Sequence, residues 1–283
     1  MNVLTFDIEE WFQIKFDSDF LDENKISRYE NRIDNNMQFI FDILDQYNLK
    51  ATFFSLGWVA KKYPQILKKI IKKGHELGSH SHLHKLVYNQ NKEDFSEDLR
   101  LSIQSIEDVV GKKVELYRAP NFSINQDNTW AFEEMAKQGI KIDCSICPTK
   151  KKISESKDFN LLKPSKILTK SNIELKEFPI NTFKLFKTRV IFSGGGYFRI
   201  LPYFFLKKMM NASDYVMTYF HPRDFDPDQP ILDDISLIRY FKSYIGLSNS
   251  KKKLDRLFKD FKFMSVGEAC NKIDWTKAPI YKL

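Results

Sequence analysis

Four of the five histidines of this chain lie within ten residues, in the segment HELGSHSHLH from His75 to His84. His80 and His84 are four residues apart, so in a helical turn both imidazoles would lie on one face. Two neutral imidazoles make up half of a tetrahedral zinc-type ligand set, and a carboxylate from another part of the chain would complete a catalytic centre. The spacing therefore predicts a metal site, against the alternative of a polar loop with incidental histidines.

Other reactive side chains lie at or near the ends of apolar, strand-like runs. They are Asp7 and Glu9 at the end of the run from Val3 to Ile8, and then Arg118, Asp143 and His221. In barrels of alternating strands and helices, the reactive residues are on loops at the carboxyl ends of the strands. The shared placement of these residues predicts that they meet the histidines at one end of the fold.

Together these residue types predict a metal-assisted amide hydrolase. A metal held by two imidazoles and one carboxylate lowers the pKa of water and polarises a carbonyl group. Asp7 and Glu9 could divide the roles of general base and metal ligand, and Arg118 would hold the base ionised. His221 could supply the proton that a leaving amine requires.

Strand-like and helical patterns alternate along the chain and predict one α/β domain over residues 1–283, with a parallel sheet that is most economically a barrel. Strands are expected near residues 3–8, 51–56, 76–79, 113–118, 140–146, 215–220 and 262–266. Helices are expected near residues 32–47, 58–73, 94–110, 128–138, 201–211, 231–245 and 251–260. Residues 149–177 are polar and lysine-rich, which predicts an irregular insertion.

The net charge of the 283-residue chain is +8, from 45 Lys and Arg against 37 Asp and Glu. The lysine runs stand beside amphipathic patterns, which is typical of solvated helix faces, and no arginine-rich run with interleaved aromatics indicates nucleic acid. Attraction to an anionic membrane surface stays open as an alternative.

The chain starts with a strand-like run rather than a basic and apolar leader, and it has no apolar run of ~20 residues. Its three cysteines give no disulfide framework. We therefore expect a cytoplasmic protein. Several conspicuous residues are expected to be structural: His75, His82, the pair Cys144 and Cys147, and the turn Gly194-Gly195-Gly196.

Six segments in chain order carry a resemblance to a known family. They are TFDIEEWF (5–12), ATFFSLGWVA (51–60), GHELGSHSHLHKLVY (74–88), YRAPNFSI (117–124), SGGGYFRILP (193–202) and YFHPRDFDPDQP (219–230). These segments resemble the polysaccharide deacetylase family, which is the NodB-homology group or carbohydrate esterase family 4. The similarity is closest to its exopolysaccharide-biosynthesis subgroup, whose first motif is D-x-E.

The resemblance implies a distorted (β/α) barrel with fewer than eight strands and a zinc ion, or cobalt or nickel in its place. It implies Asp7 as catalytic base, Arg118 as the partner of that base and His221 as general acid, and it implies Glu9, His80 and His84 as metal ligands. Asp143 resembles an acid that orients the catalytic histidine, although the sequence leaves Asp224 open for this role. Better-known members read T-F-D-D, so the intervening Ile8 makes Glu10 a rival ligand to Glu9.

We expect a metal-dependent de-N-acetylase that acts on an N-acetylated amino sugar in a polysaccharide or in its biosynthetic intermediate. Members with D-x-E or D-x-D motifs also hydrolyse small cyclic amides, so a small amide, imide or formamide is the alternative substrate. The aromatic loop at Trp11-Phe12 or oligomer contacts would then narrow the pocket. A non-catalytic carbohydrate-binding protein is a further alternative, and it would be expected to have lost one of Asp7, His80, His84 or His221. The expected partner is an N-acetylated glycan, with peripheral membrane proximity and oligomer formation left open.

Overall fold

The structure is a computed structural model, described for residues 1–15, 29–148, 159, 161–185, 188–233 and 235–283. Within these residues the main sheet has eight strands in the order β12-β7-β8-β6-β5-β4-β3-β2. Neighbouring strands are parallel except for β7 and β8. The strands are β2 (Thr5–Ile8), β3 (Thr52–Ser55), β4 (Glu76–Ser79), β5 (Leu116–Tyr117), β6 (Ile142–Asp143), β7 (Ser165–Leu168), β8 (Glu174–Glu177) and β12 (Ile280–Lys282).

The sheet curves toward closure at its β2 edge. β1 (Asn2–Val3) pairs in parallel with β11 (Val216–Met217), and Phe6 of β2 bridges Phe220 just beyond β11. The segment that follows β8 reaches the same place, because the backbone N–H of Met217 donates to Asn181 Oδ1 over 2.9 Å. A mostly parallel α/β fold is thereby confirmed. The sheet closes on itself through strand pairing and also through side chains such as that of Asn181. A separate hairpin joins β9 (Phe183–Leu185) and β10 (Thr188–Val190).

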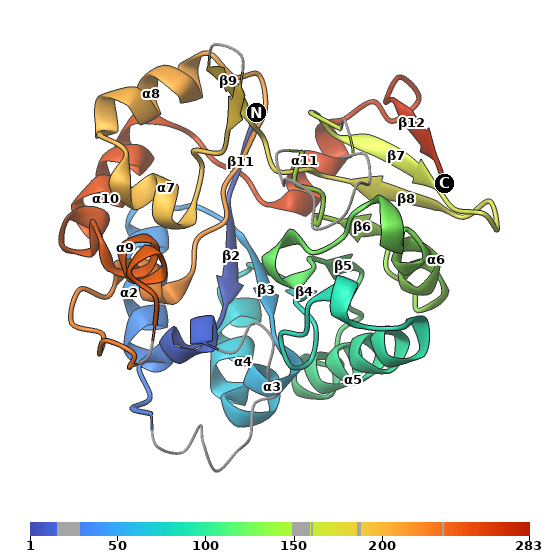
Figure 1. Ribbon diagram of the computed structural model, residues 1–283, viewed down its shortest axis with the longest axis horizontal. Helices are drawn as coiled ribbons and strands as arrows, with labels where there is room; N and C mark the ends of the chain where they lie inside the picture. Colours follow the sequence, from blue (N-terminus) through green and yellow to red (C-terminus); the bar gives the residue numbers. More distant parts are fainter. Residues whose placement is uncertain (16–28, 149–158, 160, 186–187, 234) are drawn as a thin grey trace.

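Helices surround the strands (Figure 1). They are α2 (Ile33–Gln46), α3 (Gly57–Lys62), α4 (Pro64–Lys72), α5 (Lys92–Val110), α6 (Trp130–Lys137), α7 (Gly195–Ile200), α8 (Tyr203–Asn211), α9 (Leu237–Tyr244), α10 (Ser250–Asp260) and α11 (Val266–Lys272). In Figure 1, helices α7 to α10 gather on one side, whereas β7, β8 and β12 lie on the other.

Burial explains why these elements form where the sequence periodicity predicts them. In α2 the apolar residues at helical spacing, among them Ile33, Met37 and Phe41, are buried. All four residues of β3 are buried, as befits a strand covered on both faces. Helix α5 begins where Asn91 Oδ1 accepts the backbone N–H of Asp94 over 2.7 Å, and it ends at Gly111 in the left-handed conformation.

Four expected boundaries are wrong. The helix expected over 58–73 is divided into α3 and α4 because Pro64 cannot continue the preceding helix and begins a new one. The helix expected over 231–245 begins only at Leu237. Within the insertion expected at 149–177, residues 165–168 and 174–177 are strands of the main sheet, while 149–158 and 160 lie outside the described residues. The strand expected at 262–266 is a single bridge at Met264, which precedes α11.

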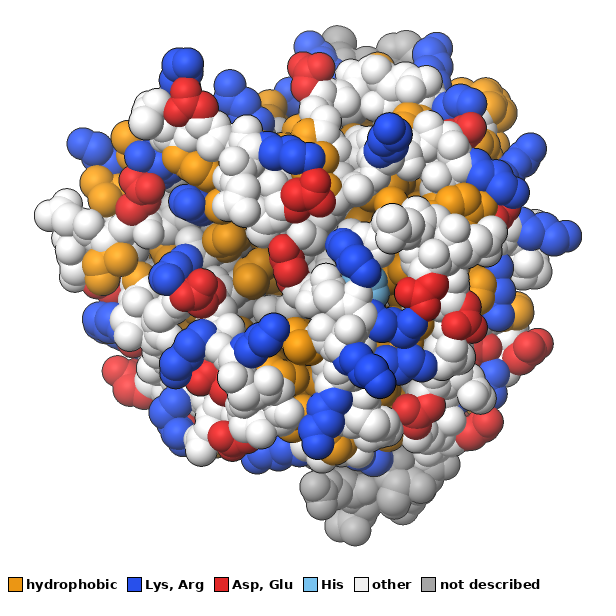
Figure 2. Space-filling view, turned by 180° about the vertical axis from the view of Figure 1, so that it is seen from behind, with side chains coloured by type: hydrophobic (Ala, Val, Ile, Leu, Met, Phe, Trp, Pro, Cys, Tyr) orange, Lys and Arg blue, Asp and Glu red, His pale blue; other side chains and the backbone are white. Residues whose placement is uncertain are grey.

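The surface seen in Figure 2 carries Lys and Arg interspersed with Asp and Glu. This distribution agrees with the expectation that most lysine runs are solvated faces of helices. A search of the described residues finds no helix that combines the length and the apolar character needed to cross a membrane.

Gly194 gives a test of the packing that closes the fold. A Cβ atom added there would lie 2.1 Å from the carbonyl oxygen of Tyr219, so Gly194→Ala should lower the free energy of unfolding by about 2 to 3 kcal/mol through overpacking. The matched control is Gly139→Ala, where nothing lies within 4 Å and only the left-handed backbone at φ +87° opposes the substitution, at about 1 kcal/mol. Urea unfolding of both variants measures the difference, and equal losses would contradict this packing.

Candidate active site

Parallel strands bring the candidate catalytic and metal-binding residues to one end of the sheet. Asp7 is in β2 and Glu9 follows it, His80 follows β4, Arg118 follows β5, and His221 comes four residues after β11. The carboxyl ends of parallel strands meet at one edge, so residues more than 200 positions apart in the chain become neighbours. This arrangement explains why the strand-end pattern was informative.

Glu9, His80 and His84 form a buried three-residue cluster. Glu9 Oε1 lies 2.9 Å from His80 Nε2 and 3.0 Å from His84 Nε2, and the potential ligand atoms all lie within 4.8 Å of one another. Burial would raise the pKa of the Glu9 carboxyl, but the neighbouring His84 and His80 outweigh it and hold this pKa well below its ordinary value. The cluster therefore presents an ionised carboxylate beside two imidazoles.

The hydrogen bonding of His80 fits a bound cation. His80 Nδ1 lies 2.7 Å from the carbonyl oxygen of Arg118, and because a carbonyl only accepts, the hydrogen bond assigns the proton to Nδ1. A neutral ring then directs its Nε2 lone pair at Glu9 Oε1. Two acceptors this close repel unless a proton or a cation lies between them. One divalent transition metal meets this need, because two nitrogens and one carboxylate oxygen are a usual donor set for zinc.

The prediction that His80 and His84 share a helical turn is wrong. Residues 80–86 form a loop, in which Ser81 and His84 have positive φ angles of 75° and 60°. The loop is held against α3, since the backbone N–H of Gly57 donates to the carbonyl of Ser81 and that of Trp58 donates to the carbonyl of His82. The two imidazoles still converge on Glu9, but left-handed backbone rather than helix periodicity brings them together.

Asp7 lies beside the cluster and is held by Arg118. Arg118 Nη1 donates to Asp7 Oδ1 over 2.7 Å and also lies 2.7 Å from Thr5 Oγ1. Arg118 is fully buried, and its guanidinium carbon lies 4.3 Å from the centre of the Phe54 ring. The second carboxylate oxygen of Asp7 stands 3.9 Å from His221 Nε2. Asp7 therefore has a fixed countercharge on one side and a titratable imidazole on the other.

His221 is oriented by Asp224. His221 Nδ1 lies 3.0 Å from Asp224 Oδ2, and Asp224 Oδ1 lies 3.0 Å from Arg199 Nε. Burial would lower the pKa of His221, but the hydrogen bond and charge of Asp224, with smaller contributions from Glu9 and Asp7, raise this pKa to about 9. Burial would raise the pKa of Asp224, and the opposing effects of His221 and Arg199 lower it to about 2. His221 is therefore a protonated imidazolium near neutral pH.

Asp143 does not orient His221, which corrects the role that the sequence implied. Its carboxylate accepts the hydroxyl of Ser145 over 2.5 Å and is hydrogen bonded to Glu177 within the interior. Burial raises the pKa of both carboxyls, that of Glu177 strongly, because the neighbouring negative charge of Asp143 adds to it. Asp143 is a buried structural acid. Asp224 takes the orienting role, and its signal in the sequence was its place three residues after His221, where its carboxylate also accepts the backbone N–H of that histidine over 2.9 Å.

The structure distinguishes Glu9 from Glu10. Glu10 Oε1 accepts the backbone N–H groups of Arg32 and Ile33 at the start of α2, at 3.3 and 3.4 Å, and the hydroxyl of Tyr63 at 3.3 Å. Burial is the main cause that raises the pKa of Glu10 to about 7. Glu10 therefore satisfies the open N–H groups of a helix start and faces away from the two imidazoles.

The remaining conspicuous residues lie outside this cluster. His75 is buried between Phe41 and Phe53, and burial lowers its pKa to about 4. His82 is buried against Gly57, with its pKa likewise lowered to about 4. Cys144, Cys147 and Cys270 are buried and form no disulfide bond with one another. These positions agree with the structural roles that the sequence predicts for the two histidines and the Cys144–Cys147 pair.

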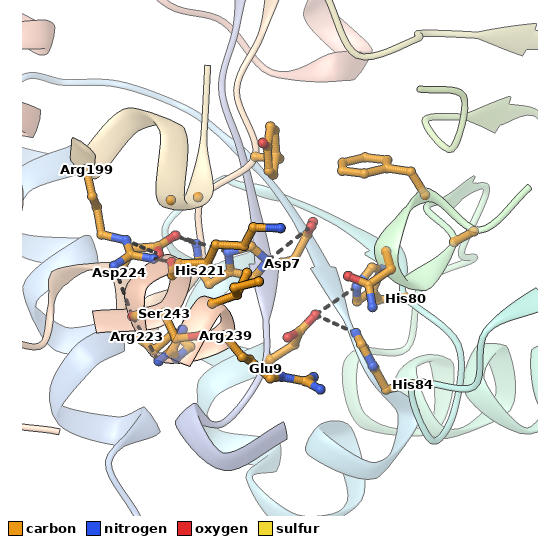
Figure 3. Close-up of a pocket in the computed structure, with 18 of the residues that line it drawn as sticks. Asp7, Glu9, His80, His84, Arg199, His221, Arg223, Asp224, Arg239 and Ser243 are labelled. Atoms are coloured by element: carbon orange, nitrogen blue, oxygen red, sulfur yellow. Dashed lines mark hydrogen bonds and ion pairs between the residues drawn. The ribbon is translucent and has the colours of Figure 1, made fainter. Parts of the chain in front are cut away.

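All the candidate residues except Arg118 and Asp143 line one cleft of about 480 Å³ (Figure 3). Sequence reasoning missed several other lining residues: Asn121, Gly195, Gly196, Arg199, Tyr219, Arg223, Ile238, Arg239, Lys242 and Ser243. Many of them come from α7 and α9. Segment 193–202, which contains α7, resembles the family, but neither helix offers a residue pattern that by itself predicts a chemical role. Only the folded chain places these helices beside the strand ends.

Comparisons with known proteins agree with this fold. A family model described as polysaccharide deacetylase matches residues 12–141, and a domain of unknown function (DUF3473) matches residues 144–271. A peptidoglycan-N-acetylglucosamine deacetylase from Bacillus cereus is 32% identical over 96 residues, 34% of this chain and 35% of that protein. A peptidoglycan deacetylase from Helicobacter pylori is 28% identical over 107 residues, 38% of this chain and 36% of that protein.

Solved structures show the same fold. A protein from Mycobacterium smegmatis classed with the polysaccharide deacetylases has a TM-score of 0.67 at 16% identity, covering 100% of this chain and 92% of that one. A family 4 pseudoenzyme from Bacillus anthracis has a TM-score of 0.53 at 12% identity, covering 100% of this chain and 69% of that one.

Residues 12–141 of this chain therefore resemble a polysaccharide deacetylase domain in sequence, and the whole chain shares the fold of the solved structure from Mycobacterium smegmatis. The aligned segments span little more than a third of the curated relatives described above. The exopolysaccharide subgroup and the cytoplasmic location stay predictions.

Neighbouring glutamates give a matched test of the metal cluster. We expect purified protein to hold about one equivalent of zinc or a similar divalent metal, and Glu9→Ala to weaken binding at least about a hundredfold, because a ligand is lost. Glu10→Ala removes the same side chain one residue away but should keep the metal, since Glu10 accepts backbone N–H groups at the start of α2. Elemental analysis after dialysis, with circular dichroism to check folding, measures this. Metal retained by Glu9→Ala and lost by Glu10→Ala would contradict the assignment.

Proposed function

We propose that this protein is a metal-dependent de-N-acetylase, which hydrolyses the acetamide of an N-acetylated amino sugar in a polysaccharide or in its biosynthetic intermediate. The observation that carries the proposal is the meeting of three groups in one cleft. Glu9, His80 and His84 form a metal-type cluster, Asp7 is paired with Arg118, and His221 is paired with Asp224. All residues of the metal-type cluster and of the His221–Asp224 pair line the cleft. Of the Asp7–Arg118 pair, Asp7 lines it.

Each group has a distinct task in amide hydrolysis. A divalent metal held by Glu9, His80 and His84 supplies a Lewis acid that polarises a carbonyl and makes water more acidic. Asp7 accepts the proton of the attacking water as general base, and Arg118 holds its carboxylate in place. His221 donates the proton of its Nε2 to the amine nitrogen as the C–N bond breaks, because an amide nitrogen leaves poorly unless it is protonated. The products are acetate and the free amino sugar.

The two peptidoglycan deacetylases among the relatives support a saccharide substrate. A small-amide substrate predicts a closed pocket, narrowed either at Trp11 and Phe12 or by oligomer contacts. Both side chains are instead buried in the core, where Phe12 stacks on Tyr29, and neither lines the cleft. No observation therefore favours the small-amide hydrolase over the deacetylase.

We also propose that residues 1–283 form one catalytic domain. The segment matched as polysaccharide deacetylase contains β3 to β5, and the segment matched as a domain of unknown function contains β7 and β8 of the same sheet. His80 and His84 come from the first segment and His221 from the second. A division between them would separate the metal-type cluster from the proton donor.

Replacing the base tests the reaction. Asp7→Asn should lower kcat/KM for acetate release from N-acetylglucosamine oligosaccharides by about 10² to 10⁴-fold, since a neutral amide cannot accept the proton of water. The matched control is Asp143→Asn, an equal change at a buried acid outside the cleft, which should keep a rate near that of the unchanged protein. No acetate release from any oligosaccharide, with rapid hydrolysis of a small cyclic imide, would favour the alternative substrate.

The pH profile tests the proton donor. His221 must be protonated to donate, so the rate should fall as pH rises through its pKa of about 9. Asp224→Asn removes the largest contribution that raises this pKa, and the alkaline limb should therefore move to lower pH. Measurement of kcat/KM against pH for both proteins, which reports the groups of the substrate-free protein, shows this shift. An alkaline limb that stays in place would exclude His221 as the titrating acid.

A further inference from the structure

Helix α9 forms part of the cleft wall but exposes an apolar face. Leu237, Ile238 and Phe241 are 87%, 71% and 51% exposed, and among the residues of α9 only Ser243 is buried. At helical spacing, positions 237, 238 and 241 fall within about 100° of one another, so they form a single face. By contrast, the apolar residues of α10, such as Leu254 and Leu257, are buried. The apolar face of α9 thus adds little to the core.

Positive charge flanks this apolar face. Arg239 and Lys242 are the charged residues of α9, and both line the cleft. Lys251 and Lys252 follow at the start of α10, and residues 235–254 contain no Asp or Glu. A helix with an apolar face bordered by Lys and Arg is suited to lie in the interface of an anionic bilayer.

The position of α9 is fixed relative to the proton donor. Arg199 Nη1 donates to the carbonyls of Ser243 and Ile245 at 2.9 and 3.0 Å, and its Nη2 donates to that of Lys242 at 2.7 Å. The same side chain contacts Asp224, so one buried guanidinium joins α9 to the acid that orients His221. Figure 3 shows Arg239 and Ser243 at the cleft beside Glu9 and Asp224. A surface that binds α9 therefore lies at the mouth of the cleft.

We propose that α9 docks this protein on an anionic lipid bilayer. Leu237, Ile238 and Phe241 enter the apolar boundary, while Arg239 and Lys242 face the headgroups. A second copy of the chain is a poorer occupant, because pairing two α9 faces would bring equal positive charges together. If the proposed function holds, docking brings the cleft to saccharides anchored in the membrane, but the docking itself requires no hydrolytic activity.

Flotation of the full chain with vesicles tests the proposal. Vesicles of equal parts phosphatidylcholine and phosphatidylglycerol should carry the protein upward, more so than vesicles of phosphatidylcholine alone, and added salt should weaken binding. Leu237→Ser with Phe241→Ser should weaken binding about tenfold or more through loss of apolar contact. The control is Ile280→Ser, which removes a 57% exposed apolar residue from β12 and should bind as the unchanged protein does.

The outcomes distinguish an anionic bilayer from a second copy of the chain as the partner of α9. No flotation of the unchanged protein, or equal flotation of the double variant, would overturn the proposal. Light scattering that shows a dimer dispersed by the double variant, without vesicle binding, would assign the face to a second copy. Because binding is measured without substrate, failure of the deacetylase proposal would leave this result unaffected.

Discussion

The buried guanidinium of Arg118 is the constraint on which the site depends. It is fully buried, so its charge requires partners, and it finds them in Asp7, Thr5, the carbonyl of Cys144 and the sulfur of Met217. Its own backbone carbonyl accepts His80 Nδ1. One residue therefore holds the candidate base through its side chain and a candidate metal ligand through its backbone. Removing it would leave a buried carboxylate without its countercharge, which costs several kcal/mol in typical proteins.

The second half of the chain completes what the first half begins. Glu9, His80 and His84 come from strand ends on one side of β2, whereas His221 and Asp224 follow β11, which adjoins β1. Arg199, from α7, then connects Asp224 to the backbone of α9. The segment matched as a domain of unknown function thus contributes the candidate proton donor, the acid that orients it and one wall of the cleft. Its structural role is to complete the candidate site.

Residue type and strand-end placement predicted the cluster because a parallel sheet has one carboxyl edge. The predicted residues all converge at that edge: Asp7, Glu9, His80, His84, Arg118 and His221. Their position at or near strand ends was enough to predict this, without knowledge of the exact loop conformations. The local backbone conformation was harder to predict from the sequence. The left-handed turn at His84 replaces the expected helical turn, and Pro64 divides a helix whose apolar periodicity continues through it. Asp224 rather than Asp143 reaches His221 because a turn of three residues folds it back. Arg199 and Arg239 were not predicted, because only tertiary packing brings α7 and α9 to the strand ends.

The proposed deacetylation depends on a metal held by the cluster of Glu9, His80 and His84. The most direct measurement titrates zinc into metal-depleted protein and follows bound metal and acetate release from an N-acetylglucosamine oligosaccharide in the same samples. We expect acetate release to rise in proportion to bound zinc and to saturate at about one equivalent. Full acetate release from metal-depleted protein, or saturation with zinc without acetate release from N-acetylated saccharides, would contradict the proposal.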